Sequence, residues 1–153
     1  MLTKRLYILL ICLWATIGLS AQELSIDECF NDNVLTRKSV TAVKVKGERL
    51  KAYNLTTFRS ITVVGDGRTA SWVQRMAKLD AKRATDREEG VKDGKLQYAF
   101  YVFRRNKGKT YRYIFFRNNK PEQEAVTDVT LVYMEGKATL AELKQVFNLR
   151  NLN

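Results

Sequence analysis

The sequence contains no histidine, and this absence excludes several kinds of active site. Serine–histidine–aspartate and cysteine–histidine catalysis both need an imidazole as the general base. Histidine is also the commonest protein ligand of zinc, and the two cysteines are too few for a structural zinc site. We therefore expect no catalytic residue, no metal site and no bound cofactor.

Cysteine is scarce, and Cys12 and Cys29 are the only two. Cys12 lies in an N-terminal stretch that we expect to be removed, so the mature chain would have no partner for an internal disulfide. Its domain must be held together by an apolar core, unlike the small exported domains that depend on disulfides. Two interpretations of Cys29 stay open: a buried small hydrophobic residue, and a thiol that pairs between chains.

The first 21 residues have the pattern of a secretory signal peptide. Lys4 and Arg5 precede an apolar stretch from Leu6 to Leu19, and small residues at Ser20-Ala21 offer a cleavage site. That stretch is shorter than the roughly 20 apolar residues of a bilayer-spanning helix, and an uncleaved anchor is the alternative. We expect an exported protein, periplasmic or extracellular, with no membrane span after cleavage and one domain over residues 22–153.

Acidic residues are outnumbered by lysine and arginine, which gives the whole chain a net charge of +11. Removal of Lys4 and Arg5 would leave +9 on the mature chain. A basic protein of this size can bind nucleic acid, anionic lipid or acidic polysaccharide. Export makes intracellular nucleic acid the least favoured of these partners, and the sequence leaves the oligomeric state open.

Hydrophobic periodicity predicts an α+β domain. We expect a mostly antiparallel sheet of five to six strands, with a long helix and a C-terminal helix packed mainly on one face. Strands are expected at 39–46, 58–64 and 126–134, with a β-hairpin over 96–119; helices are expected from Ser25, over 69–89 and from Thr139. Two capping boxes support the first and last helices, Ser25 with Glu28 and Thr139 with Glu142.

The hairpin holds many of the aromatic residues, and its turn at 106–109 places Tyr101 opposite Ile114. Alternation then gives two faces, both partly apolar. The first carries Leu96, Tyr98, Phe100, Val102, Arg104, Tyr111, Tyr113, Phe115 and Arg117; the second carries Gln97, Ala99, Tyr101, Phe103, Arg105, Thr110, Arg112, Ile114 and Phe116. One face should pack on the helices, and the sequence does not decide which.

Exposed aromatic and arginine side chains on a sheet suit contact with a ligand or a partner protein. The candidate contact surface consists of Tyr98, Arg104, Tyr111, Tyr113 and Arg117. The alternative is that one face is core and the other a ladder of cross-strand aromatic pairs.

The long helix carries an apolar stripe of Trp72, Val73, Met76 and Leu79, which we expect to face the core. It also carries a candidate anion patch, and a glycine-rich stretch precedes it. The patch consists of Arg68, Arg75, Lys78 and Lys82. The stretch 65–70 matches G-x-G-x-x-A formally, but a dinucleotide site needs a parallel β-α-β unit, which this chain is too short and too rich in hairpins to form. A tight turn is the simpler interpretation, and a small anion held by the helix N-terminus and Arg68 is the weaker functional one.

Several motifs occur in a characteristic order: T-A-V-K-V-K-G-E-R-L, F-R-S-I-T-V, D-G-K-L-Q-Y-A-F-Y-V-F, K-T-Y-R-Y-I-F-F and V-T-L-V-Y-M-E-G-K-A-T-L-A-E-L. This layout resembles small exported α+β proteins of Bacteroidetes that form families of unknown function. The ending Leu19-Ser20-Ala21-Gln22 is also typical of signal peptides in that phylum. Several such families are lipoproteins. This chain departs from them, because Cys12 does not stand at the position of a lipid-attachment cysteine. The resemblance implies an envelope location and this fold class, and no activity.

The leading hypothesis is a non-catalytic envelope module that binds a partner protein or an anionic glycan or lipid surface through the open sheet face. The alternative is a histidine-free hydrolase acting on an envelope polymer. It would need two carboxylates across a cleft, or a serine beside a lysine.

Overall fold

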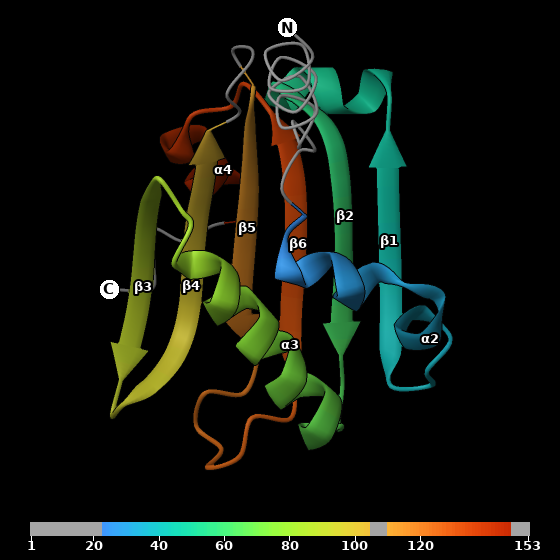
Figure 1. The fold of residues 1–153 in the computed structure, drawn as a ribbon, viewed down its shortest axis with the longest axis vertical. Helices are drawn as coiled ribbons and strands as arrows, with labels where there is room; N and C mark the ends of the chain where they lie inside the picture. Colours follow the sequence, from blue (N-terminus) through green and yellow to red (C-terminus); the bar gives the residue numbers. More distant parts are fainter. Residues whose placement is uncertain (1–22, 105–109, 148–153) are drawn as a thin grey trace, which may run out of the picture.

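In the computed structural model, residues 23–104 and 110–147 are described, and they form one six-stranded antiparallel sheet with helices on both faces (Figure 1). The strands are β1 (Val40–Lys46), β2 (Leu55–Val63), β3 (Asp86–Lys92), β4 (Lys95–Arg104), β5 (Tyr111–Asn118) and β6 (Val129–Gly136). Their order across the sheet is β1-β2-β6-β5-β4-β3. The last strand therefore lies near the centre, between β2 and β5.

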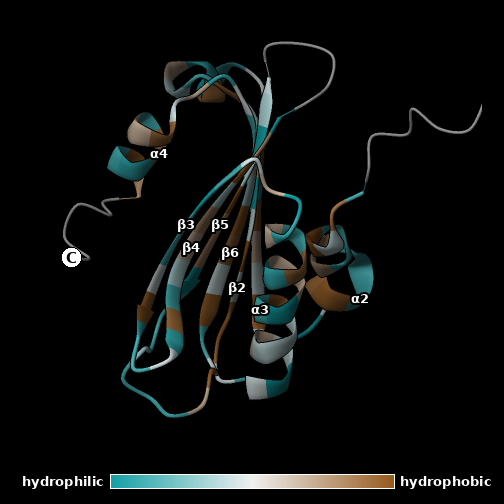
Figure 2. Cartoon of the chain, turned by 60° about the vertical axis from the view of Figure 1, so that its left-hand side comes forward, coloured by the Kyte–Doolittle hydropathy of each residue, from teal (hydrophilic) through white to brown (hydrophobic). Residues whose placement is uncertain are grey.

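The helical elements divide between the two faces of the sheet. One face carries the 3-10 helix η1 (Ser25–Phe30), the short α2 (Asp32–Leu35) and the long α3 (Gly67–Ala81). The 3-10 helix η2 (Glu48–Tyr53) and α4 (Leu140–Val146) contribute to the core on the other face. Figure 2 shows α3 and α4 on opposite sides of the strands.

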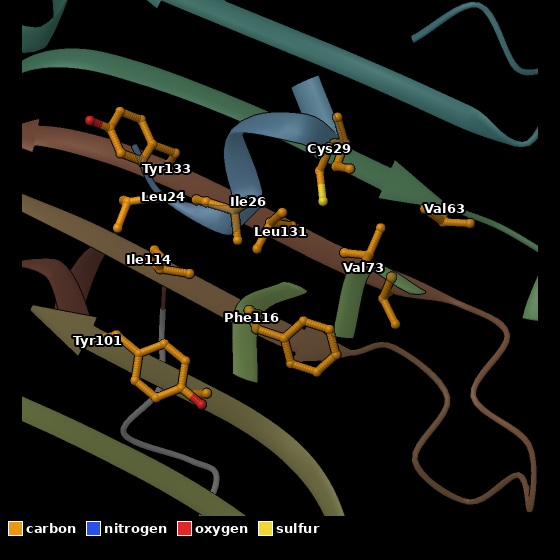
Figure 3. Close-up of a cluster of buried hydrophobic side chains, with 14 of the residues drawn as sticks. Leu24, Ile26, Cys29, Val63, Val73, Tyr101, Ile114, Phe116, Leu131 and Tyr133 are labelled. Atoms are coloured by element: carbon orange, nitrogen blue, oxygen red, sulfur yellow. The ribbon is translucent and has the colours of Figure 1, made fainter. Parts of the chain in front are cut away.

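The first core lies between α3, η1 and the sheet, and Figure 3 shows part of it. Val73 of α3 and Ile26 of η1 are fully buried against the second hairpin face, the face of Tyr101. Cys29 is also fully buried in this core, and burial, the main cause, raises the pKa of its thiol to about 12. The interpretation of Cys29 as a buried small residue is confirmed.

The second core lies on the opposite face, where aromatic rings meet α4. The Phe115 ring stacks on Phe147 with ring centres 4.6 Å apart, and Phe100 lies 5.1 Å from Phe115. Leu143 of α4 is fully buried in the same cluster. The central strands are apolar on both faces, so both faces need a cover.

The α+β class, the antiparallel sheet and both helices are confirmed, as are the Tyr101–Ile114 pair and the Thr139–Glu142 capping box. The placement differs in one respect from the expectation that both helices pack mainly on one face. The final helix lies opposite the long helix, because its apolar residues join the core around Phe115.

The expected helix over 69–89 is too long. The structure ends α3 at Ala81, and the chain turns there through a hydrogen bond from the Ala84 N–H to the Ala81 carbonyl. Residues Asp86–Lys92 form the edge strand β3 instead. Their charged residues suit a helix by local preference, but pairing along β4 outweighs that preference, and charge is common on edge strands.

Two further expectations are wrong in detail. Leu96 does not share a face with Tyr98, because pairing shifts between Gly90 and Val91 and leaves Gln97 as a β-bulge. Leu96 therefore joins the first core. The expected Ser25–Glu28 capping box is absent from the described start of η1, where the Asp27 carboxylate accepts from the Leu24 N–H instead.

Asp80 of α3 replaces that cap and holds η1 on the helix. Its side chain has 0% exposure, and its two oxygens accept hydrogen bonds from the Ser25 N–H at 2.7 Å and the Ile26 N–H at 2.9 Å. Arg83 neutralises it through an ion pair at 2.6 Å. One buried carboxylate therefore joins α3 to η1, because Asp80 binds backbone groups 55 and 54 residues before it in the chain.

We expect Asp80→Ala to lower the free energy of unfolding by about 3 kcal/mol, because two backbone N–H groups lose their acceptor and Arg83 loses its partner. Urea unfolding at neutral pH measures this loss. Asp86→Ala, which removes an exposed carboxylate from β3, is the matched control and should change stability by less than about 0.5 kcal/mol. Equal effects of the two substitutions would contradict the role assigned to Asp80.

Candidate functional site

All five residues of the candidate contact surface lie on the sheet face that α4 partly covers. Tyr98 pairs with Arg117 across β4 and β5, and Arg104 pairs with Tyr111. Tyr113 follows on the same face of β5. The structure thus brings the five onto one face, but their side chains differ in exposure.

Tyr113 is a core residue. Its side chain is 1% exposed, and its hydroxyl donates to the Ala138 carbonyl at 2.5 Å. Burial raises the pKa of Tyr113 to about 12. Tyr113 therefore anchors the segment between β6 and α4 and presents little surface to a partner.

Tyr98 is half-buried and is used within the sheet. Its hydroxyl donates to Glu88 of β3 at 3.3 Å, and Glu88 also pairs with Lys144 of α4. Its ring lies over Gly90, where an added Cβ would be 2.1 Å from the ring. Burial, together with the Glu88 charge, raises the pKa of Tyr98. The ring therefore links β3, β4 and α4.

Arg104 and Tyr111 line a groove of about 610 Å³ between the ends of the strands and the start of α4. Its lining residues are Thr85, Asp86, Val102, Arg104, Tyr111, Tyr113, Lys137, Ala138, Thr139 and Leu140. Asp86 is the single carboxylate of this described lining, so the paired carboxylates of a hydrolase are not brought together here.

A second hollow of about 540 Å³ lies beside η1 and holds more acidic residues. Its lining residues are Glu23, Leu24, Ser25, Asp27, Glu28, Asn31 and Arg83. Asp27 is engaged in an ion pair with Arg59 at 2.5 Å, and the Arg59 guanidinium lies between the rings of Phe30 and Tyr133. No lysine is among these described lining residues, so Ser25 has no lysine base there.

The four residues of the anion patch lie together on the solvent side of α3. Arg68, Arg75, Lys78 and Lys82 are all exposed. At 3.6 residues per turn, residues seven apart lie within about 20° of one another around a helix, which aligns Arg68, Arg75 and Lys82. In the described part of the chain, no ion pair uses any of the four.

An apolar line that the sequence did not reveal runs beside this cationic line. The hydrophobic pattern places Trp72, Met76 and Leu79 in a buried stripe with Val73, but Leu79 is 44% exposed and Trp72 is half-buried. Three of the four residues one turn from Leu79 are basic, namely Arg75, Lys82 and Arg83. That local composition is the signal that could have placed Leu79 on the surface.

The N-terminus of α3 is occupied by the protein's own carboxylate. Asp66 accepts from the Thr69 N–H at 3.0 Å, the Thr69 hydroxyl at 2.6 Å and the Ser39 hydroxyl at 2.9 Å. These hydrogen bonds, those from Thr69 above all, lower the pKa of Asp66 to about 2. The glycine-rich stretch is therefore a helix cap, and the sheet around it is antiparallel, which is not the setting of a dinucleotide site.

The described residues contain neither a metal-binding cluster nor a membrane-spanning helix. No group of three or more cysteine, aspartate or glutamate side chains is arranged to hold a metal ion in that part of the chain. None of the helices described there is both long enough and apolar enough to cross a membrane.

The fold and its surface define a small α+β domain with an antiparallel sheet covered on both faces and a basic outer helix. The chain belongs to a family of unknown function, DUF6108, which it matches over residues 13–147. The expectation of an unknown-function family is thereby confirmed. No curated protein and no solved structure matches the chain.

The lowered pKa of Asp66 gives a prediction for acid stability. A carboxyl group with a lower pKa in the folded state stabilises that state above the pKa of the unfolded chain, about 3.9, and loses this effect as the pH falls towards 2. We expect Asp66→Ala to cost about 1 kcal/mol at pH 6 through the lost cap, and the difference from the unchanged protein to shrink between about pH 4 and pH 2. Urea unfolding across this range measures it, and a difference independent of pH would contradict it.

For Tyr113 we expect a structural effect alone. Tyr113→Phe keeps the buried ring but leaves the Ala138 carbonyl without its donor, which should lower the free energy of unfolding by about 1 kcal/mol. Thermal unfolding measures the change. Tyr111→Phe is the control on the same strand, since the half-buried Tyr111 side chain lines the groove. An unchanged free energy of unfolding in Tyr113→Phe would show that the hydroxyl is not an anchor.

Proposed function

We propose that this protein is a non-catalytic module of the cell envelope that binds an anionic surface through the solvent side of α3. The observation that carries the proposal is the line of Arg68, Arg75 and Lys82 with Lys78 beside it, all exposed on one side of one helix. Such a line attracts a partner with many negative charges, because each contact is weak and several act together.

The packing of the sheet favours the helix over the sheet as the contact surface. Both faces of the sheet are occupied by cores, and Tyr113 and Tyr98 are engaged in contacts within the fold. Of the residues proposed for the open sheet face, Arg104 and Arg117 are exposed and remain available to a partner. These two arginines therefore provide the comparison against which the helix can be tested.

The spacing of the cations supports concerted binding. Residues seven apart on a helix are separated by about 10.5 Å along its axis, so Arg68 to Lys82 covers about 21 Å. Neighbouring cations are thus little more than one Debye length apart at physiological ionic strength, about 8 Å. Their fields overlap at a surface that they approach together, and added salt should weaken the binding.

Composition and the N-terminal pattern support the rest of the proposal. The absence of histidine and the ion pair that engages Asp27 beside η1 favour binding over catalysis. The signal-peptide pattern of residues 1–21 favours action outside the cytoplasm, where anionic lipids and polymers are available.

We expect the protein, purified after expression of the full chain, to be retained on a heparin column and to elute at lower salt when Arg75→Glu and Lys82→Glu are combined. The immobilised heparin serves as a model polyanion, and charge reversal removes two of its contacts with the protein. The elution salt concentration is the measurement.

The matched control is Arg104→Glu combined with Arg117→Glu, which makes the same change of charge on the sheet face that α4 partly covers. If the helix is the contact surface, this control should change elution far less than the helix variant does. Equal shifts would show that heparin responds to net charge alone, and a larger shift in the control would restore the sheet face as the site.

A further inference from the structure

We infer that the anionic surface is a lipid bilayer, against which α3 lies flat with Trp72 and Leu79 in the headgroup region. The inference rests on the proposed function and goes beyond it by choosing between a lipid and a glycan. Three features of the described residues carry it: the shape of the basic surface, the apolar line beside the cations, and the anchoring of α3 in the fold.

The shape of the basic surface favours a planar partner. Two hollows lie among the described residues, the groove at the start of α4 and the hollow beside η1. Neither is lined by Arg68, Arg75, Lys78 or Lys82. The outer side of α3 is the convex surface of a helix that rests on the sheet (Figure 2). A ligand that is recognised by its shape is usually held in a concave site, whereas a bilayer needs only an exposed surface with charges on one side.

The apolar line favours lipid over a purely polar polyanion. Leu79 is exposed, and Trp72 is half-buried because part of it packs against the first core. The two lie seven residues apart beside the cationic line. Cations next to large apolar side chains are the pattern of helices that lie in a membrane interface. Tryptophan is enriched at that depth, because its ring is apolar and its N–H can meet the headgroups.

The anchoring of α3 determines how far it can enter the bilayer. Val73, Ala70 and Ala77 of its inner side are fully buried on the sheet. The helix therefore cannot turn its main apolar side towards lipid without unfolding the first core. Contact is restricted to the outer side, so binding should be peripheral, reversible and sensitive to salt.

Arg37 extends the basic surface at the N-terminal end of the helix. It is exposed and donates a hydrogen bond from Nη1 to the Thr69 hydroxyl at 2.9 Å, which holds it against the first turn of α3. The surface offered to phosphate groups thus continues beyond Arg68 onto the turn that follows α2.

The test measures binding of the purified protein to vesicles of phosphatidylcholine with and without phosphatidylglycerol. We expect binding only when the anionic lipid is present, and a drop of the partition coefficient by about tenfold or more for combined Arg75→Glu and Lys82→Glu. Leu79→Gln should lower vesicle binding several-fold without changing elution from heparin. Arg104→Glu combined with Arg117→Glu, the matched control, should bind vesicles nearly as well as the unchanged protein.

Fluorescence provides a second measurement. The sequence has tryptophan at positions 14 and 72, so Trp72 is the single tryptophan of a chain cleaved after Ala21. Transfer of its ring into the interface should shift its emission to shorter wavelength when anionic vesicles are added. The cleaved protein is confirmed by its mass before this measurement.

The outcomes separate the two proposals. Retention on heparin without binding to anionic vesicles would overturn the lipid inference and leave the proposed function standing, with a glycan as the partner. Failure to bind either heparin or anionic vesicles would overturn both the proposed function and the lipid inference. Vesicle binding that is indifferent to Leu79→Gln, or that leaves the Trp72 emission unchanged, would overturn the flat orientation of α3.

Discussion

The central strands β5 and β6 are apolar on both faces, and the rest of the structure follows from covering them. Ile114 and Phe116 face α3 and η1, whereas Phe115 and Met134 face the core that includes α4. Burial of apolar surface is the main favourable term in folding, so neither face could be left to water. The chain meets this demand with three helical segments on one side, and with η2 and α4 on the other.

This two-sided cover limits where a partner can bind. Aromatic residues that a sheet without a cover would expose are buried in the two cores. Tyr113 is an example, because its hydroxyl is buried and bound within the fold. The buried Asp80 commits the inner side of α3 and the start of η1 to one another. This packing favours the outer surface of the helices for recognition, and the exposed charged residues of α3 are all basic.

Local patterns predicted what depends on local physics. Alternation and turn residues predicted the register of the aromatic hairpin, and a capping box predicted the start of α4. Tertiary contacts decided the rest: pairing with β4 made a strand of the charged segment after Ala81, and the distant Asp80 took over the cap of η1. The four basic residues of the anion patch were named from the sequence and are all exposed, and their role in binding stays a prediction. The exposure of Leu79 was missed, because periodicity cannot show where a helix passes the edge of its own core.

The strand order has a consequence for how the chain acquires its structure. The hairpin β1–β2 and the meander β3-β4-β5 can each form from neighbouring residues, but they meet only through β6, which pairs with β2 on one side and β5 on the other. Such distant pairing slows folding, because a long loop must close before the contacts are gained. The two halves of the sheet can therefore join only after β6, which ends at Gly136, has been synthesised. For the envelope protein that we propose, this late closure would keep the chain unfolded for passage through a membrane channel.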